Sequence, residues 1–164
     1  MGAEPPDRGP GRGARAICLG FPAAEREVSR SLRRVRRLLA EMGLTDDGIE
    51  RAELVLAEAL NNVVEHACAH CHGAPVRLDI RHEGGHLDCL IRDSGAPMPG
   101  AAPPRGRRAD PPVARDALPE GGFGWMLIRS LTERVSYRRD GSCNRLSLRI
   151  PVAPERPANT ALGP

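Results

Sequence analysis

The sequence predicts an α+β fold, a two-layer sandwich in which a mixed, mostly antiparallel sheet packs against helices on one of its faces. Three observations lead to this prediction. Two long segments in the first half repeat apolar residues at helical spacing. Four later segments are typical of strands, and they come in two pairs around short turns that contain glycine. Strands joined in hairpins, with helices on one side, bury their apolar surfaces in two layers.

The first half of the chain is expected to hold one strand and two helices. The strand, Arg15–Phe21, is short. The first helix spans Ala24–Met42 and has an arginine-rich face opposite its apolar face. The second helix begins at Asp46 or Asp47, either of which can cap it, and runs to about Ala69.

The second half is expected to hold two hairpins and one further helix. Val76–His82 and His86–Asp93 make the first hairpin, and Val135–Arg139 and Asn144–Ile150 make the second. A short helix, Trp125–Thr132, lies between the two hairpins. The predicted order is therefore strand, helix, helix, two strands, helix, two strands.

Three segments fall outside these elements. Residues 94–121 form a loop dense in proline, glycine and arginine, and so long a loop in a compact domain is usually either a functional lid or disordered. Residues 1–14 and 152–164 are rich in proline, glycine and alanine, so disordered tails are expected there. A single domain over residues 15–151 remains, which suits a chain of 164 residues.

The composition excludes several chemistries. The chain has no lysine, so its 24 basic residues are all arginines. A P-loop, whose lysine reaches the terminal phosphates, is therefore excluded, and so is Schiff-base chemistry. The net charge of +3 is mild. Without a recognition motif it does not predict direct binding to nucleic acid.

The distribution of apolar residues bears on location. No apolar run approaches the length of about 18 residues that a membrane span needs, and the segment Met1–Ala14 lacks the apolar core of a secretory signal. A cytoplasmic protein without membrane contact is therefore expected. Its five cysteines are then expected to be thiols.

The second predicted helix carries a polar stripe. Glu58, Asn62 and His66 follow one another at intervals of four residues, which places them on one face. A solvated face of an amphipathic helix would have the same spacing. The adjacent pair Asn61 and Asn62 argues for a further role, because asparagine is a poor helix former without a local reason.

A second motif, Asp93-Ser94-Gly95, stands at the end of a predicted strand. An aspartate at such a position can accept a hydrogen bond from a buried donor. Gly95 lets the chain turn beside a ligand. An ordinary Asp-x-Gly turn is the alternative interpretation.

A third motif, Gly122-Phe123-Gly124, precedes the apolar part of the last predicted helix. Free backbone N–H groups at a helix N-terminus can face phosphate. The motif is not a Rossmann fingerprint, because no strand precedes it and a third glycine is missing. A flexible loop joining a helix is the alternative.

These three motifs, in this order, resemble the boxes of the GHKL ATPase superfamily, whose Bergerat fold binds ATP under a lid. Residues 58–62 resemble the N box, residues 93–96 the G1 box and residues 122–127 the G2 box. The resemblance covers about residues 15–151. It extends to the stand-alone anti-sigma-factor serine kinases, which often carry a run like residues 118–124. One departure is the continuation Ala96-Pro97-Met98-Pro99, where a further glycine or an aromatic residue is usual.

The resemblance implies binding of ATP and Mg²⁺ and suggests a role for each residue. Asp93 would accept the exocyclic amine of adenine, and Asn62 would hold Mg²⁺. Glu58 would be the catalytic residue, which accepts a proton from the attacking hydroxyl or orients it. His66 would act structurally beside the nucleotide. Further contacts with ATP are implied for Gly95, Pro97, Gly122, Phe123, Gly124, Trp125 and Met126.

The implied function is that of an ATP-dependent serine/threonine kinase in a partner-switching pathway. Such a kinase binds a sigma factor or another regulator and phosphorylates a STAS-domain antagonist (an anti-anti-sigma protein) on serine. Two alternatives stay open: a nucleotide-loaded module that sequesters its partner without phosphorylating it, and a detached sensor-kinase ATPase domain. A homodimer is compatible with either. The sequence does not choose among the lid arginines that could neutralise the γ-phosphate: Arg105, Arg107, Arg108 and Arg115.

Two further features have alternative interpretations. The run from Cys68 to His72 matches the C-x-x-C-H pattern of haem attachment, but attachment needs an export signal, and a haem would collide with the nucleotide site. Zinc at Cys68 and Cys71 lacks a second ligand pair at the usual spacing, so we expect no bound transition metal. The pairs Arg33-Arg34 and Arg36-Arg37 indicate a solvated helix face, or a docking surface for an acidic partner.

Overall fold

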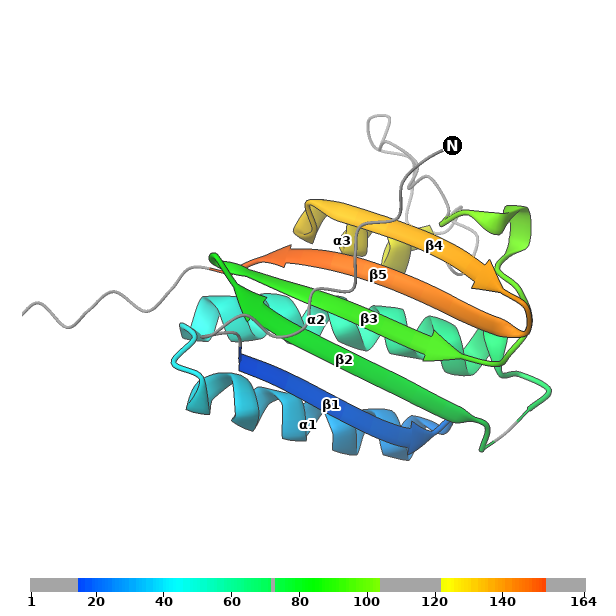
Figure 1. The fold of residues 1–164 in the computed structure, drawn as a ribbon, viewed down its shortest axis with the longest axis horizontal. Helices are drawn as coiled ribbons and strands as arrows, with labels where there is room; N and C mark the ends of the chain where they lie inside the picture. Colours follow the sequence, from blue (N-terminus) through cyan, green and yellow to red (C-terminus); the bar gives the residue numbers. More distant parts are fainter. Residues whose placement is uncertain (1–14, 72, 104–121, 153–164) are drawn as a thin grey trace, which may run out of the picture.

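The computed structural model describes residues 15–71, 73–103 and 122–152. Their elements follow the predicted order (Figure 1). The bounds are β1 Arg15–Pro22, α1 Glu25–Glu41, α2 Asp46–Asn62, the π-helical turn η1 Val63–Ala67, β2 Pro75–Glu83, β3 His86–Asp93, the 3₁₀ turn η2 Pro99–Ala101, α3 Gly122–Leu131, β4 Arg134–Asp140 and β5 Cys143–Pro151. The tails and most of the predicted lid lie outside the described residues, so the expectation of disordered tails stays a prediction.

The five strands form one sheet in the order β1-β2-β3-β5-β4. All four pairings between neighbours are antiparallel. The expectation of a mixed sheet is therefore wrong, and the sheet of the described residues is antiparallel throughout. The reason is the path of the chain: β2 and β3 form one tight hairpin, β4 and β5 form another, and β5 enters beside β3 in the opposite direction.

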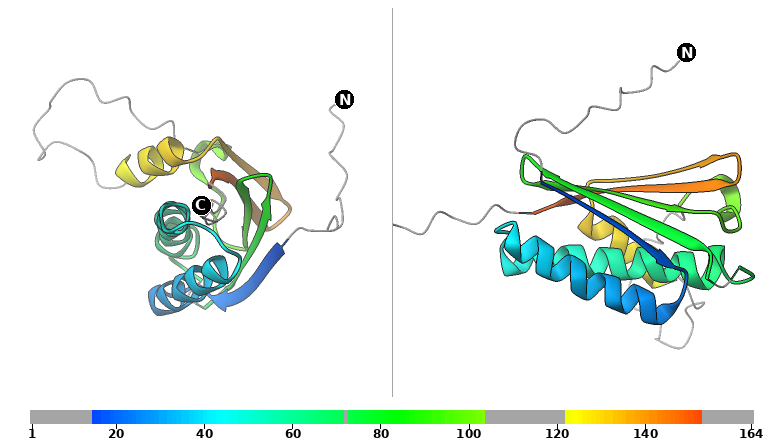
Figure 2. Two further views of the ribbon diagram at one scale, coloured as in Figure 1. Left: turned by 90° about the vertical axis from the view of Figure 1, so that its left-hand side faces the viewer. Right: turned by 60° about the horizontal axis from the view of Figure 1, so that its bottom comes forward.

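The helices cover one face of the sheet, with α2 between α1 and α3 (Figure 2). Alternate residues of each central strand point toward these helices, as the burial of β2, β3 and β5 shows. The core between the layers is almost wholly aliphatic. Its largest fully buried side chains include Leu39, Leu56, Leu60, Leu78, Ile80, Leu87, Ile91, Ile128 and Ile150.

The start of α2 differs from the prediction by one residue. Thr45, rather than Asp46 or Asp47, is the N-cap, and its side-chain oxygen accepts a hydrogen bond from the backbone N–H of Gly48 at 3.2 Å. The two aspartates instead occupy the first turn. Negative charge is favourable there because the unpaired N–H groups of a helix N-terminus carry partial positive charge.

The end of α2 also differs from the prediction of one regular helix to about Ala69. The α-helix ends at Asn62, and one wider π turn follows, in which the N–H of Cys68 donates to the carbonyl oxygen of Val63 at 2.8 Å. Such turns shift the following side chains around the helix axis, and they are frequent at functional sites. Here the turn lies beside the start of the loop that leaves β3.

The arginines of α1 are partly engaged in ion pairs. Arg36 lies 2.6 Å from Glu53 of α2, and Arg30 lies 2.8 Å from Glu27. Arg33 and Arg34 are exposed. Ion pairs of this kind are expected on a solvated helix face. Docking of an acidic partner to this face stays a prediction. No helix among the described residues is long and apolar enough to cross a membrane.

Candidate functional site

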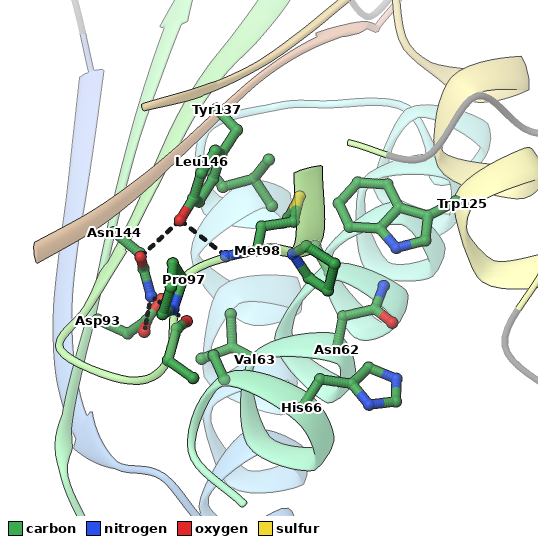
Figure 3. Close-up of a pocket in the computed structure, with 14 residues that line it drawn as sticks. Asn62, Val63, His66, Asp93, Pro97, Met98, Trp125, Tyr137, Asn144 and Leu146 are labelled. Atoms are coloured by element: carbon green, nitrogen blue, oxygen red, sulfur yellow. Dashed lines mark hydrogen bonds between the residues drawn. The ribbon is translucent and has the colours of Figure 1, made fainter. Parts of the chain in front are cut away.

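A cavity of about 440 Å³ opens between α2, the η1 turn, the end of β3, α3 and the last hairpin (Figure 3). Residues from the three segments 58–62, 93–96 and 122–127 line it, although the first and third segments are more than fifty residues apart along the chain. The lining residues are Ala59, Asn62, Val63, His66, Ala67, Asp93, Ala96, Pro97, Met98, Pro99, Trp125, Tyr137, Asn144 and Leu146.

Asp93 is the buried charge of the cavity, with only 6% of the residue exposed. Its Oδ1 accepts two hydrogen bonds, from the backbone N–H of Gly95 at 2.8 Å and from Asn144 Nδ2 at 2.8 Å. Both hydrogen bonds that the Asp93 carboxylate accepts from the described residues are made by Oδ1. Oδ2 is therefore available to a donor in the cavity. A carboxylate that is buried and half-satisfied in this way is suited to bind a ligand N–H group.

Asn144 was not singled out by the sequence analysis. It is 3% exposed and lies directly opposite Asp93 in the register of β3 and β5. Figure 3 shows its hydrogen bonds with Asp93 and Tyr137 beside the cavity. The signal that could have revealed it is its place on β5: the buried positions are Asn144, Leu146, Leu148 and Ile150, and one polar residue breaks this apolar series. A polar side chain at a buried strand position needs partners.

Gly95 does not line the cavity, and it lies behind Asp93 against the η1 turn. A Cβ built on Gly95 would come to 2.2 Å from the carbonyl oxygen of Ala67, closer than any side chain allows. The close approach permits the N–H of Ala96 to donate to the same oxygen at 2.7 Å. Glycine is therefore required here by the protein backbone, whereas the prediction assigned its small size to contact with the nucleotide.

Asn62 is the polar group of the cavity wall on α2. Its Nδ2 is buried and has no hydrogen-bond partner among the described residues. An unpaired buried amide is costly, commonly about 1–3 kcal/mol, so a ligand that pairs with this amide gains correspondingly. Rotation about the side chain can present Oδ1 in place of Nδ2, which is the atom that a hard cation would require.

Glu58, one helical turn before Asn62, faces the start of α3. A Cβ on Gly124 would lie 2.6 Å from Glu58 Oε2 and 3.9 Å from Asn62 Nδ2. The first turn of α3 is thus seated on the polar stripe of α2. A carboxylate, an amide and the N-terminus of a ten-residue helix meet at this place.

The predicted site residues divide by position. Asn62, His66, Asp93, Pro97 and Trp125 line the cavity. Trp125 is 6% exposed, and His66 is exposed.

The other predicted contacts lie around the first turn of α3. Gly122 is the first residue of α3, and Gly124 contacts Glu58 as described. Phe123 is 57% exposed and Met126 is 36% exposed, and neither lines the cavity. The four lid arginines, Arg105, Arg107, Arg108 and Arg115, lie outside the described residues.

The cysteine cluster lies at the end of the η1 turn. Cys68 is buried in the core, and burial, followed by a hydrogen bond with Cys71, raises the pKa of its thiol to about 12. His70 is exposed, and His72 lies outside the described residues. Within the described part of the chain no three His, Cys, Asp or Glu side chains are grouped to hold a metal ion.

Comparison with protein-family models gives one match over most of the chain. The model described as the histidine kinase-like ATPase domain matches residues 21–150. This range begins in β1 and ends in β5, so it includes every element that builds the cavity.

Two curated relatives are similar in sequence. A serine/threonine-protein kinase, BtrW, of Bordetella bronchiseptica is 38% identical over 101 residues, which are 60% of this chain and 67% of the relative. A serine-protein kinase, RsbW, of Halalkalibacterium halodurans is 29% identical over 109 residues, which are 60% of each protein.

A solved structure shares the fold. The crystal structure of the RsbU and RsbW domains of a Mycobacterium tuberculosis protein superposes with a TM-score of 0.57 at 16% identity. The superposition covers 88% of this chain and 34% of that one.

Proposed function

This chain belongs to the histidine kinase-like ATPase domain family, and we propose that it is an ATP-dependent serine/threonine protein kinase of the anti-sigma-factor type. The named relatives are serine or serine/threonine kinases, which supports the reaction class. The catalytic unit is the domain over residues 15–151. The observation that carries the proposal is the buried carboxylate of Asp93, which has one oxygen available in a cavity that Asn62 also lines. Glu58 lies one helical turn before Asn62, against the first turn of α3.

The adenine end of the site is the Asp93 side. The free oxygen of the carboxylate accepts a hydrogen bond from the exocyclic amine of adenine, which has hydrogens to donate. Guanine presents a carbonyl oxygen at the same place and would face a carboxylate oxygen, so the site selects against it. Pro97, Met98 and Trp125 supply apolar surface around the base.

The phosphate end of the site is the junction of α2 and α3. Backbone N–H groups of Gly122 to Gly124 begin a helix, and a helix N-terminus favours negative charge. Asn62 is the residue of this site that would hold Mg²⁺, and its unpaired amide fits this role after rotation. The ion, when bound, neutralises phosphate charge and fixes the orientation of the phosphates.

Glu58 is the proposed catalytic residue. Its half-buried carboxylate lies at the first turn of α3, beside the phosphate end of the site. There it can accept the proton of a serine or threonine hydroxyl presented by a partner protein, or orient that hydroxyl. His66 lies one turn beyond Asn62 on the cavity wall and contributes to binding rather than to proton transfer. Phe123 and Met126 of α3 are also proposed to contact ATP, at the phosphate end of the site.

The proposed partners follow from the same family type. The kinase would bind a sigma factor or another regulator and phosphorylate a STAS-domain antagonist on serine, in the cytoplasm. A homodimer is compatible with this arrangement.

Two measurements test the proposal. Calorimetry in the presence of Mg²⁺ should show binding of ATP in preference to GTP, and EDTA should weaken it. Incubation with γ-labelled ATP and a STAS-domain protein encoded beside the kinase gene should label that protein on serine. Absence of ATP binding by the intact chain would refute the site. Binding without transfer would favour a sequestering module.

A further inference from the structure

We propose that Asn144 is a positioning residue that orients the Asp93 carboxylate and thereby sets the preference for adenine over guanine. The inference rests on the proposed ATP site and adds to it a residue that is remote from the three sequence motifs. Its basis is the hydrogen-bond network between β3, β4, β5 and the loop that leaves β3. Figure 3 shows the bonds among Asp93, Asn144, Tyr137 and Met98.

The contact between Asn144 and Asp93 is short and buried. The two residues are cross-strand partners of β3 and β5, and they are 3% and 6% exposed. Asn144 Nδ2 donates to Asp93 Oδ1 at 2.8 Å. A hydrogen bond to a carboxylate is stronger than one between neutral groups, and exclusion of water preserves it.

The orientation of the Asn144 amide is determined by two donors on β4. Arg139 Nη1 and the Tyr137 hydroxyl each lie 2.6 Å from Asn144 Oδ1. A guanidinium can only donate. The Tyr137 oxygen accepts from the backbone N–H of Met98 at 2.9 Å, so its own hydrogen is directed to Asn144. Reversal of the amide would oppose donor to donor, which keeps Nδ2 toward Asp93.

The result for Asp93 is a carboxylate with two different oxygens. Oδ1 is engaged by Asn144 and by the backbone N–H of Gly95 at 2.8 Å. Oδ2 is the oxygen left for the ligand. Two donors on one oxygen prevent rotation of the carboxylate, so Oδ2 is presented as an acceptor in one direction. Adenine and guanine differ at the atom that such an acceptor meets.

Asn144 also holds the loop after β3. Its Nδ2 lies 2.9 Å from the carbonyl oxygen of Ala96 and 3.3 Å from that of Gly95. A structural role and a positioning role therefore coexist, and they predict different results. Loss of loop anchoring weakens binding of every purine nucleotide, whereas loss of the Asp93 orientation reduces the ratio of ATP affinity to GTP affinity.

The test is the affinity of the full chain for ATP and for GTP, measured with Mg²⁺ by competition against a fluorescent ATP analogue. Asn144→Leu keeps the size of the side chain and removes its polar atoms. We expect it to weaken ATP binding by roughly 10- to 100-fold, the usual effect of losing a hydrogen bond to a charged group, while GTP binding changes much less. Ser147→Ala, on the same strand but facing the other side of the sheet, is the control and should keep both affinities.

The outcomes separate the inference from the function on which it rests. A folded Asn144→Leu protein with equal losses for ATP and GTP overturns the positioning role and leaves the ATP site intact. A wild-type chain that binds no ATP overturns both.

Asn144→Asp covers the case in which the leucine variant does not fold. Its side chain can still accept from Tyr137 and Arg139 but places a second carboxylate against Asp93. As the pH falls, the two adjacent carboxylates take up one shared proton, and that proton restores the lost bond. Relative to wild type, ATP affinity should therefore recover as pH falls from 8 to about 5. If the ratio of the ATP affinity of Asn144→Asp to that of wild type stays constant with pH, the inference is overturned.

Discussion

Gly124 in the first turn of α3 lies against the carboxylate of Glu58 on α2, so closely that a Cβ at position 124 would be 2.6 Å from Glu58 Oε2. The atom that it would meet is the mobile end of a side chain, not backbone. The contact joins the first and third sequence motifs at the proposed site of phosphoryl transfer. Substitutions there should therefore affect the position of the carboxylate more than the fold.

Gly124→Ala is expected to reduce phosphoryl transfer by about 10-fold or more, because the added methyl group displaces the Glu58 carboxylate and misplacement of a catalytic group is costly. The melting temperature should stay level or rise, since alanine is a better helix former than glycine by about 1 kcal/mol. Labelled phosphate transfer and calorimetric melting measure the two effects. Unchanged transfer with an unchanged melting temperature would contradict the proposed role of the contact.

Gly95→Ala, unlike Gly124→Ala, should destabilise the protein. Its Cβ would meet the backbone of Ala67, at 2.2 Å from the oxygen, and backbone cannot move aside as a side chain can. A cost of about 1–3 kcal/mol is expected, which lowers the melting temperature by roughly 4–10 °C. Gly20→Ala is the control, because nothing lies within 4 Å of its added Cβ. Equal melting temperatures for the two variants would refute this explanation.

Glu58→Gln should separate binding from chemistry. The substitution is nearly isosteric and removes a negative charge beside the phosphates, so ATP should bind as well as to wild type or slightly better. Transfer to a STAS-domain partner should fall by roughly 10²- to 10⁴-fold, the usual scale for losing a general base. Asn62→Ala is the matched contrast, and it should lose Mg-ATP affinity and transfer together. If Glu58→Gln transfers phosphate at the wild-type rate, another group accepts the proton of the hydroxyl or orients it.

Asp93→Asn should weaken ATP binding by at least 10-fold, because an amide replaces the carboxylate in a network whose donors already surround it. The new NH₂ group must face either a donor of the protein or the amine of adenine. Calorimetric titration measures the loss, and circular dichroism checks that the variant is folded. Wild-type affinity in this variant would place the base elsewhere in the cavity.

Cys68 should make the stability of the protein depend on pH in the alkaline range. Burial raises the pKa of its thiol to about 12 in the folded chain, from an ordinary value of about 9. The unfolded chain therefore loses this proton first, so stability is complete below pH 9 and declines between pH 9 and pH 12, by about 1.4 kcal/mol per pH unit. Denaturant titrations of Cys68→Ala should show a shallower decline than wild type. An equally steep decline in Cys68→Ala would show that another group is responsible.

The sequence by itself determined the elements and their order. Helical repeats of apolar residues and glycine-containing turns act between near neighbours in the chain, so the two long helices and the two hairpins could be predicted from spacing alone. The same holds for the stripe of Glu58, Asn62 and His66, because residues four apart on a helix share a face wherever the helix lies. Asn62, His66 and Asp93 do meet in one cavity.

Tertiary structure decided the features that depend on residues far apart in the chain. The π turn after Asn62 and the close approach of Gly95 to Ala67 arise where the end of α2 meets the loop after β3. Asn144 becomes part of the site only because β5 pairs with β3, which places it opposite Asp93 across 51 positions of sequence. Local spacing specifies which face a residue occupies, but strand pairing and packing determine which residue of another element it meets, because hydrogen bonds and steric contacts act through space and not along the chain.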